Sequence, residues 1–223
     1  MTEKIKLHDF VSIDYTGRLV DGSVFDTTEE RIAKINGFFS EKMKFGPATI
    51  CVGEHQILPG LDQGIIDREV GSTFNLKLTP EQAFGKREVK NIKIMPLSSF
   101  REHKMQPQPG LQIDVDGQRG TITSVSGGRV IVNFNHPLAG KEVEYHVTIH
   151  KKITDHHEQI TAFLHSSLQI PEAHIKVAIK EEKAEVKIPI NFPEQITKVL
   201  GEKLAELTGL KEVTFAAPEV AKQ

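Results

Sequence analysis

The chain has 223 residues, of which 38% are hydrophobic and 26% charged, a composition typical of a soluble globular protein of one to three domains. Its formal charge of -2 gives no electrostatic footprint for nucleic acid or anionic membranes, and its single cysteine excludes an intrachain disulfide. The N-terminus lacks the apolar core of a signal peptide, and no run approaches the roughly 18 apolar residues of a membrane helix. We therefore expect a cytoplasmic protein without nucleic-acid or membrane partners.

The first part of the chain carries the alternating pattern of an antiparallel sheet. Apolar and polar residues alternate over 10–16, 73–79 and 141–152, which is the period of half-buried strands. Asp21-Gly22 is typical of a tight turn, and 58–66 opens with Pro-Gly and predicts a short helix packed against the sheet. Cys51 falls in a strand-like stretch, where a thiol usually acts as a small buried hydrophobe. These elements predict an α+β fold.

Residues 86–134 interrupt this pattern and predict an inserted small β module. Three short strand-like stretches surround turns at Asp116-Gly117 and Gly127-Gly128. The apolar residues of the module exceed what three short strands can bury, and flexible methionine suits variable partners. We predict that the following residues bind unfolded client chains: Met95, Leu97, Phe100, Met105, Leu111, Ile113, Val125, Val130 and Val132.

Residues 155–223 predict a C-terminal domain with the order α-β-β-α-β. Asp155 and Glu158 have the spacing of a helix cap, and Gly209 is typical of a helix end. The second helix carries one apolar stripe, formed by Ile196, Val199, Leu200, Leu204 and Leu207. Because about 69 residues make only a marginal core, we predict a homodimer through this domain. A monomeric domain that caps the first one is the alternative.

Four ordered motifs carry a family resemblance. They are "VSIDYTGRLVDGSVFDTT", "VGEHQILPGLDQGI", "EQAFGKRE" and "NHPLAGKEVEYHVTI". In this order and spacing they resemble the FKBP-type peptidyl-prolyl cis-trans isomerases. The insert resembles the insert-in-flap domain of the SlyD subgroup, and the extra C-terminal domain resembles the long archaeal members. The resemblance implies an FKBP-like half-barrel sheet around a short helix, made of 1–85 and 135–153.

The same resemblance implies where proline binds. The catalytic positions of the family fall on Tyr15, Asp26 and Tyr145. Its substrate-binding positions fall on Phe25, Ile57, Leu58, Leu61 and Phe84. Phe84 stands where the family usually has Tyr, and Leu61 stands where many eukaryotic members have Trp, which predicts a shallower pocket floor. The Tyr15 hydroxyl is expected to hold the Asp26 carboxylate, because buried carboxylates need partners.

These residues suit a reaction that rotates an amide without covalent chemistry or proton transfer. An X-Pro bond isomerises slowly because amide resonance must be broken. A dry aromatic pocket disfavours the polar planar amide relative to the twisted one. We therefore predict a prolyl isomerase and folding chaperone that acts on unfolded or proline-containing polypeptides. The alternative is a non-catalytic holdase or adaptor that binds peptides on the same fold.

We expect no cofactor and no metal. The chain has ten histidines, and His146 and His150 share a strand face, but zinc-type cysteine spacing is absent. The C-terminal element order also invites comparison with RNA-binding KH modules. It contains no GxxG loop and has more acidic than basic residues, so RNA binding is disfavoured.

Overall fold

The computed structural model describes residues 3–216, and it divides the chain into two compact units. The first unit combines residues 1–78 with 143–223, and the second is formed by residues 79–142. Leu78 and Val143, where the chain leaves and re-enters the first unit, are paired in register on adjacent strands. The second unit is therefore inserted at a closed strand pair of the first.

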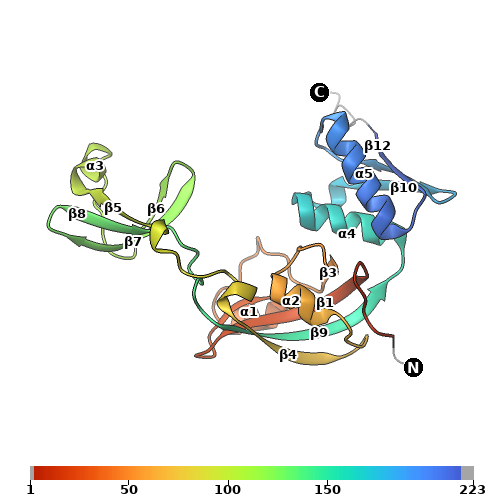
Figure 1. Cartoon of the computed structure of the whole chain (residues 1–223), viewed down its shortest axis with the longest axis horizontal. Coiled ribbons are helices and arrows are strands. Elements are labelled where there is room, and N and C mark those ends of the chain that lie inside the picture. Colours follow the sequence, from red (N-terminus) through yellow and green to blue (C-terminus); the bar gives the residue numbers. More distant parts are fainter. Residues whose placement is uncertain (1–2, 217–223) are drawn as a thin grey trace. The chain divides into compact units, whose positions relative to one another are not determined.

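The first unit is built on a five-stranded antiparallel sheet (Figure 1). Its strands are Phe10–Leu19 (β1), Val24–Thr27 (β2), Ala48–Cys51 (β3), Thr73–Leu78 (β4) and Val143–Ile153 (β9). They follow the order β2-β1-β9-β4, and β3 also pairs with β1. Two helices complete this part, Glu30–Ile35 (α1) and Pro59–Ile65 (α2). The antiparallel sheet and the short helix over 59–65 confirm the predicted fold class.

The alternating sequence pattern determines which side chains of the sheet are buried. Along β9, every second residue from Val143 to Ile149 is buried, and its neighbours are exposed or half-buried. On β1, Val11 and Ile13 are fully buried, and Leu61 and Ile65 of α2 are buried as well. Period-two burial on the strands and the apolar face of a short helix therefore form one core.

The C-terminal segment has the predicted α-β-β-α-β order. Its elements are His156–Leu168 (α4), Lys176–Lys180 (β10), Lys183–Lys187 (β11), Glu194–Thr208 (α5) and Glu212–Phe215 (β12). The Asp155 side chain caps α4 by accepting a hydrogen bond from the Glu158 N–H at 2.8 Å. Gly209 ends α5 in a left-handed conformation with φ 73°, as predicted.

The predicted apolar stripe of α5 is only partly buried. Leu204 and Leu207 are buried, whereas Ile196 is 49% exposed and Val199 is 66% exposed. The first turns of the stripe therefore do not contribute to the buried core.

The C-terminal elements pack directly on the five-stranded sheet. One apolar cluster contains Phe10 and Cys51 from the sheet together with Ile160, Phe163 and Leu164 from α4. The contact has polar links as well, since Lys203 of α5 pairs with Glu54 at 2.8 Å and Gln56 donates to the Ser167 hydroxyl at 3.0 Å. The first unit therefore has a core that runs continuously from the sheet into the C-terminal segment.

The second unit is a four-stranded antiparallel sheet with one short helix. Its elements are Ile92–Pro96 (β5), Leu97–Glu102 (α3), Gln112–Val115 (β6), Gln118–Ser126 (β7) and Arg129–Asn133 (β8). The strand order is β5-β8-β7-β6, one strand more than expected. The missed strand, β5, ends in Pro96, and proline is tolerated there because β5 lies at the sheet edge. No helix in the described part of the chain is long and apolar enough to cross a membrane.

Candidate functional site

Three aromatic rings meet where β1, β2 and β9 lie side by side. The ring centroids of Tyr15 and Tyr145 are 5.8 Å apart, and Phe25 meets Tyr145 edge to face at the same distance. Tyr145 is 2% exposed and lies opposite Gly17 in the register of β1 and β9. A Cβ atom at Gly17 would lie 2.7 Å from Cζ of Phe25 and 3.0 Å from Cε1 of Tyr145. The rings therefore need a glycine beneath them.

The carboxylate of Asp26 lies beside this cluster on β2. Burial raises its pKa above the ordinary aspartate value, and a hydrogen bond from the Thr27 backbone N–H opposes that rise. Burial, together with the nearby Asp26 charge, raises the pKa of Tyr15 to about 12. Among the described residues, the Tyr15 hydroxyl makes no hydrogen bond to Asp26. The predicted hydrogen bond from the Tyr15 hydroxyl to the Asp26 carboxylate is therefore not formed, although the two groups are close enough to interact electrostatically. The Asp26 carboxylate is instead stabilised by the backbone N–H of Thr27.

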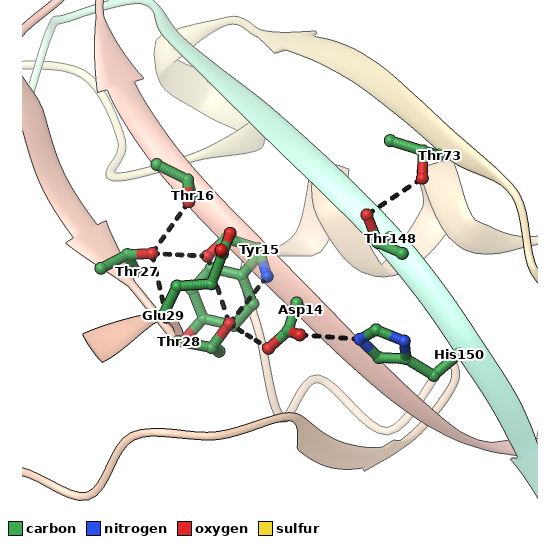
Figure 2. A network of polar contacts seen from close by, with 9 residues as sticks. All are labelled: Asp14, Tyr15, Thr16, Thr27, Thr28, Glu29, Thr73, Thr148 and His150. Atoms are coloured by element: carbon green, nitrogen blue, oxygen red, sulfur yellow. Dashed lines mark hydrogen bonds and ion pairs between the residues drawn. The ribbon is translucent and has the colours of Figure 1, made fainter. Parts of the chain in front are cut away.

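A network of threonines fixes the segment that follows Asp26 (Figure 2). Thr27 shares a 2.8 Å hydrogen bond with the Thr16 hydroxyl, and both side chains are buried. Thr28 donates to Asp14 at 2.6 Å and accepts from the backbone N–H of Tyr15 at 3.0 Å. This network ties the end of β2 to β1 on both sides of Tyr15.

Asp14 extends this network to the next strand. Its second carboxylate oxygen contacts His150 Nε2 of β9 at 2.7 Å, as Figure 2 shows. The sequence reasoning missed the supporting roles of Thr27, Thr28 and Asp14. The available signal was a pair of threonines directly after the Phe-Asp pair, since hydroxyls at a buried strand end need partners.

Ile57 lies in the loop between β3 and α2, and the buried Asp62 side chain is hydrogen-bonded to the backbone of this loop. Asp62 of α2 is buried and accepts hydrogen bonds from the backbone N–H groups of Gly53 at 2.8 Å and His55 at 3.2 Å. The Gln56 side chain also accepts from the Cys51 N–H at 2.8 Å. The position of Ile57 is therefore set by side-chain bonds to the loop backbone.

One cavity of about 760 Å³ collects part of the predicted site. Tyr15, Asp26 and Ile57 line it. Phe25 and Leu58 are half-buried, while Leu61, predicted as the pocket floor, is 1% exposed. Tyr145 is 2% exposed, packs against Tyr15 and Phe25, and does not line the cavity.

Phe84 belongs to the second unit. Its ring stacks on the imidazole of His136 with centroids 4.6 Å apart and an interplanar angle of 2°. Both residues lie in the segments that lead into and out of the insert's sheet. The stacking gives Phe84 a fixed local environment within its own unit.

The predicted client-binding residues of the insert fall into two groups. Four of them, Phe100, Ile113, Val130 and Val132, are buried together with Ile122 in the insert's core, and Met95, Leu97 and Val125 pack against it. Val130 and Val132 are 0% exposed, so neither side chain is accessible to a client in the folded insert.

The exposed apolar residues of the insert include both predicted and missed positions. Met105 is 38% exposed and Leu111 is 40% exposed, as expected for client contact. Ile94 and Val89 are also exposed, and the sequence reasoning missed both. A cavity of about 380 Å³ has Met95, Phe100 and Met105 in its wall. The exposed large apolar residues of the insert are thus Val89, Ile94, Met105 and Leu111, of which only Met105 and Leu111 belong to the predicted set.

Three further side chains of the first unit that could react or bind a metal are buried or hydrogen-bonded: Cys51, His146 and His150. Burial raises the pKa of the Cys51 thiol to about 12, so this cysteine is protonated at neutral pH. His146 contacts the Asn75 side chain at 2.6 Å, and His150 contacts Asp14. Within residues 3–216 no group of three or more His, Cys, Asp or Glu side chains could hold a metal ion.

Comparison with known proteins places this fold and site in a family. A family model described as "FKBP-type peptidyl-prolyl cis-trans isomerase" matches residues 1–100, and one described as "FKBP26, IF domain" matches residues 93–138. The short-type peptidyl-prolyl cis-trans isomerase of Methanocaldococcus jannaschii is 32% identical over 149 residues, which are 67% of this chain and 94% of the relative. The SlyD protein of Treponema pallidum is 29% identical over 151 residues, 66% of this chain and 77% of the relative.

The chain belongs to the FKBP-type peptidyl-prolyl cis-trans isomerase family. It is a prolyl isomerase, and its substrates are proline-containing polypeptides. A probable 16 kDa FKBP-type isomerase of Pseudomonas fluorescens, 28% identical over 152 residues (66% of this chain, 91% of the relative), fits the same assignment. The resemblance drawn from the motifs, including the SlyD-like insert, is confirmed.

Proposed function

We propose that Tyr15, Phe25, Asp26 and Ile57 form the proline-binding site in which the X-Pro amide is twisted. The observation that carries this proposal is the half-buried Asp26 beside Tyr15 on the wall of a single cavity, with the Tyr145 ring packed against both Tyr15 and Phe25. The proline ring packs against the apolar walls, while Asp26 faces the polar backbone of the substrate. Leu58, Leu61 and Tyr145 support these residues from behind.

Desolvation supplies the catalysis. The planar amide owes its barrier of about 18–20 kcal/mol to resonance that separates charge, and a dry pocket stabilises that charge separation less than water does. Lowering the barrier by roughly 5 kcal/mol gives about 10³- to 10⁴-fold acceleration. No proton transfer is required, which agrees with the raised pKa of Tyr15, since its hydroxyl stays protonated at neutral pH.

The test is a protease-coupled assay on a short X-Pro peptide. Asp26→Ala should lower kcat/KM about tenfold or more, because hydrogen bonds to charged groups contribute about 1.5–3 kcal/mol. Glu202→Ala, which removes an exposed carboxylate of α5, is the matched control and should leave activity unchanged. Equal activity of both variants and the parent would place the site elsewhere.

We further propose that the insert recruits unfolded chains through Met105 and Leu111. Both side chains are accessible, and the flexible thioether adapts to varied apolar partners. Replacing both with serine should weaken binding of a reduced, unfolded model protein. Val89→Ser is the control, because Val89 is an exposed apolar residue of the same unit that lies outside the predicted client-binding set. If the control and the double variant lose equal affinity, Met105 and Leu111 are not the recruiting residues.

The third part of the proposal is a homodimer through the C-terminal segment. Ile196 and Val199 are exposed one turn apart on α5, and β10 and β12 are sheet edges that a second copy could cover. Truncation near Ile153 is a poor test, because it would expose Phe10 and Cys51 of the shared core. Val199→Glu should instead yield a monomer in sedimentation, and Val20→Glu in the exposed β1–β2 turn should not. A parent protein that sediments as a monomer at tens of micromolar would exclude the dimer.

A further inference from the structure

The cavity at the proline site extends well beyond the residues that bind proline. Besides Tyr15, Asp26 and Ile57, it is lined by residues 43–50 and by one side of α4. Its volume of about 760 Å³ lies in the range of sites that enclose whole ligands of drug size. A single proline ring leaves most of this space unfilled.

Helix α4 is firmly docked as a wall of this cavity. Its buried stripe, Ile160, Phe163 and Leu164, packs in the same cluster as Cys51 of the sheet. The opposite side of the helix presents polar groups to the cavity. We call this set, together with Gln169 directly after the helix, the helix wall: His157, Glu158, Thr161, His165, Ser166 and Gln169. The bond from Gln56 to Ser167 joins the end of α4 to the loop that carries Ile57.

Two groups of the helix wall have unused hydrogen-bonding capacity. The Thr161 hydroxyl is buried and has no hydrogen-bond partner within the part of the chain that the structure describes. His165 Nδ1 lies 2.7 Å from the Ile170 carbonyl oxygen, which can only accept, so Nδ1 carries the proton. The second ring nitrogen, Nε2, is then an acceptor when the imidazole is neutral. A donor and acceptors on one wall match the N–H and C=O groups of an extended peptide backbone.

The charges around the cavity favour one class of peptide. Asp26, Glu158 and Glu172 contribute carboxylates, whereas Lys44 is the one lysine or arginine among the described lining residues. Glu158 pairs with Lys151 at 3.5 Å, and that pair is solvent-exposed and therefore screened. The cavity as a whole favours neutral or basic residues over acidic ones.

We propose that the helix wall of α4 is a substrate subsite that binds the polypeptide backbone next to the proline and disfavours acidic flanking residues. This inference rests on the proposed proline site, since the same substrate must occupy both. It gives the C-terminal segment a direct part in substrate selection. Short peptides that end near the proline do not reach the helix wall, whereas longer segments contact both.

The experiment compares kcat/KM for a short X-Pro peptide and for a longer peptide with the same X-Pro centre. Thr161→Val keeps the shape of the side chain and removes only the hydroxyl. Because that hydroxyl is buried and unpartnered, the melting temperature should stay equal or rise. Turnover of the long peptide should fall about fivefold, the effect of one hydrogen bond, while the short peptide is unaffected.

Charge preference provides a second readout. The parent should prefer a lysine-flanked over a glutamate-flanked long peptide, and Glu158→Lys should shift this preference by about threefold towards glutamate. Glu202→Lys, an equal charge reversal on α5, should leave it unchanged. Long-peptide turnover equal to the parent's in both Thr161→Val and Glu158→Lys, or equal losses on short and long peptides, would overturn the subsite. A parent that turns over neither peptide would instead overturn the proposed proline site, and the subsite with it.

Discussion

The proline site and the insert differ in what holds them together. At the proposed proline site, the Tyr15 backbone N–H donates to Thr28, and the adjacent Thr16 hydroxyl is hydrogen-bonded to Thr27. The Tyr15 ring packs on the buried Tyr145. The insert has a core of five buried side chains and leaves Met105 and Leu111 exposed. Twisting an amide requires fixed walls, whereas recruitment of varied chains requires accessible, adaptable apolar surface. The division of labour that we propose follows from this contrast.

The largest effect is expected from Tyr145→Ala. Removing a buried ring between β1 and β4 should lower the free energy of unfolding by about 3–5 kcal/mol and abolish isomerisation, because Tyr15 and Phe25 lose their support. Tyr145→Phe should retain most of both. Urea unfolding and the X-Pro assay check the two outcomes, and a stable, active alanine variant would show that the rings are held by other means.

Ile122→Ala tests the insert alone, because Ile122 lies in the core of the second unit. Ile122 is fully buried in the small core of the insert, so its truncation should lower the free energy of unfolding of the insert by about 2–5 kcal/mol. Hydrogen exchange in the full chain should rise in residues 92–133, and turnover of short X-Pro peptides should not change. Loss of peptide turnover would mean that the proline site depends on the fold of the insert.

Tyr15→Phe should have a modest effect. The hydroxyl makes no hydrogen bond to Asp26, and the ring remains packed against Tyr145. Its removal should lower kcat/KM less than about tenfold, and less than Asp26→Ala does. Steady-state kinetics on the short peptide decide this. Equal impairment of the two variants would indicate that the hydroxyl itself contacts the substrate.

The smallest effect concerns stability and pH. Because burial raises the pKa of Asp26, the folded protein binds a proton there more tightly than the unfolded chain. Stability therefore falls as pH rises from the ordinary aspartate pKa of about 3.9 through the raised folded-state value. Asp26→Asn should raise the melting temperature at neutral pH, and the difference should vanish in acid. A lower melting temperature of this variant at neutral pH would contradict a destabilised carboxylate.

Much of the fold follows from local pattern. Period-two alternation gave β1, β4 and β9, and Asp155 and Gly209 marked helix ends correctly. The edge strand β5 was missed because Pro96 argues against a strand unless its position at a sheet edge is known. Helix α1 was missed because its six residues are too few for a helical period to stand out.

The site depends more on long-range packing. Motif order selected Tyr15, Asp26 and Ile57, and all three line one cavity. The docking of α4 beside them could not be predicted, because it depends on Phe10 and Cys51 meeting a helix more than 100 residues away in sequence. The division of the insert's apolar residues into core and surface likewise depends on which strands pair.

One comparison tests the central claim, that one unit catalyses and the other recruits, most directly. Residues 86–134 are replaced by a short turn, which is feasible because the Gly140 N–H donates to the Gly85 carbonyl at 2.8 Å and holds the flanking segments together. Turnover of a short X-Pro peptide should be unchanged, while catalysed refolding of a proline-limited protein should fall about 100-fold, as expected when a linked binding site is lost. Equal losses on the two substrates would contradict separate catalytic and recruiting units.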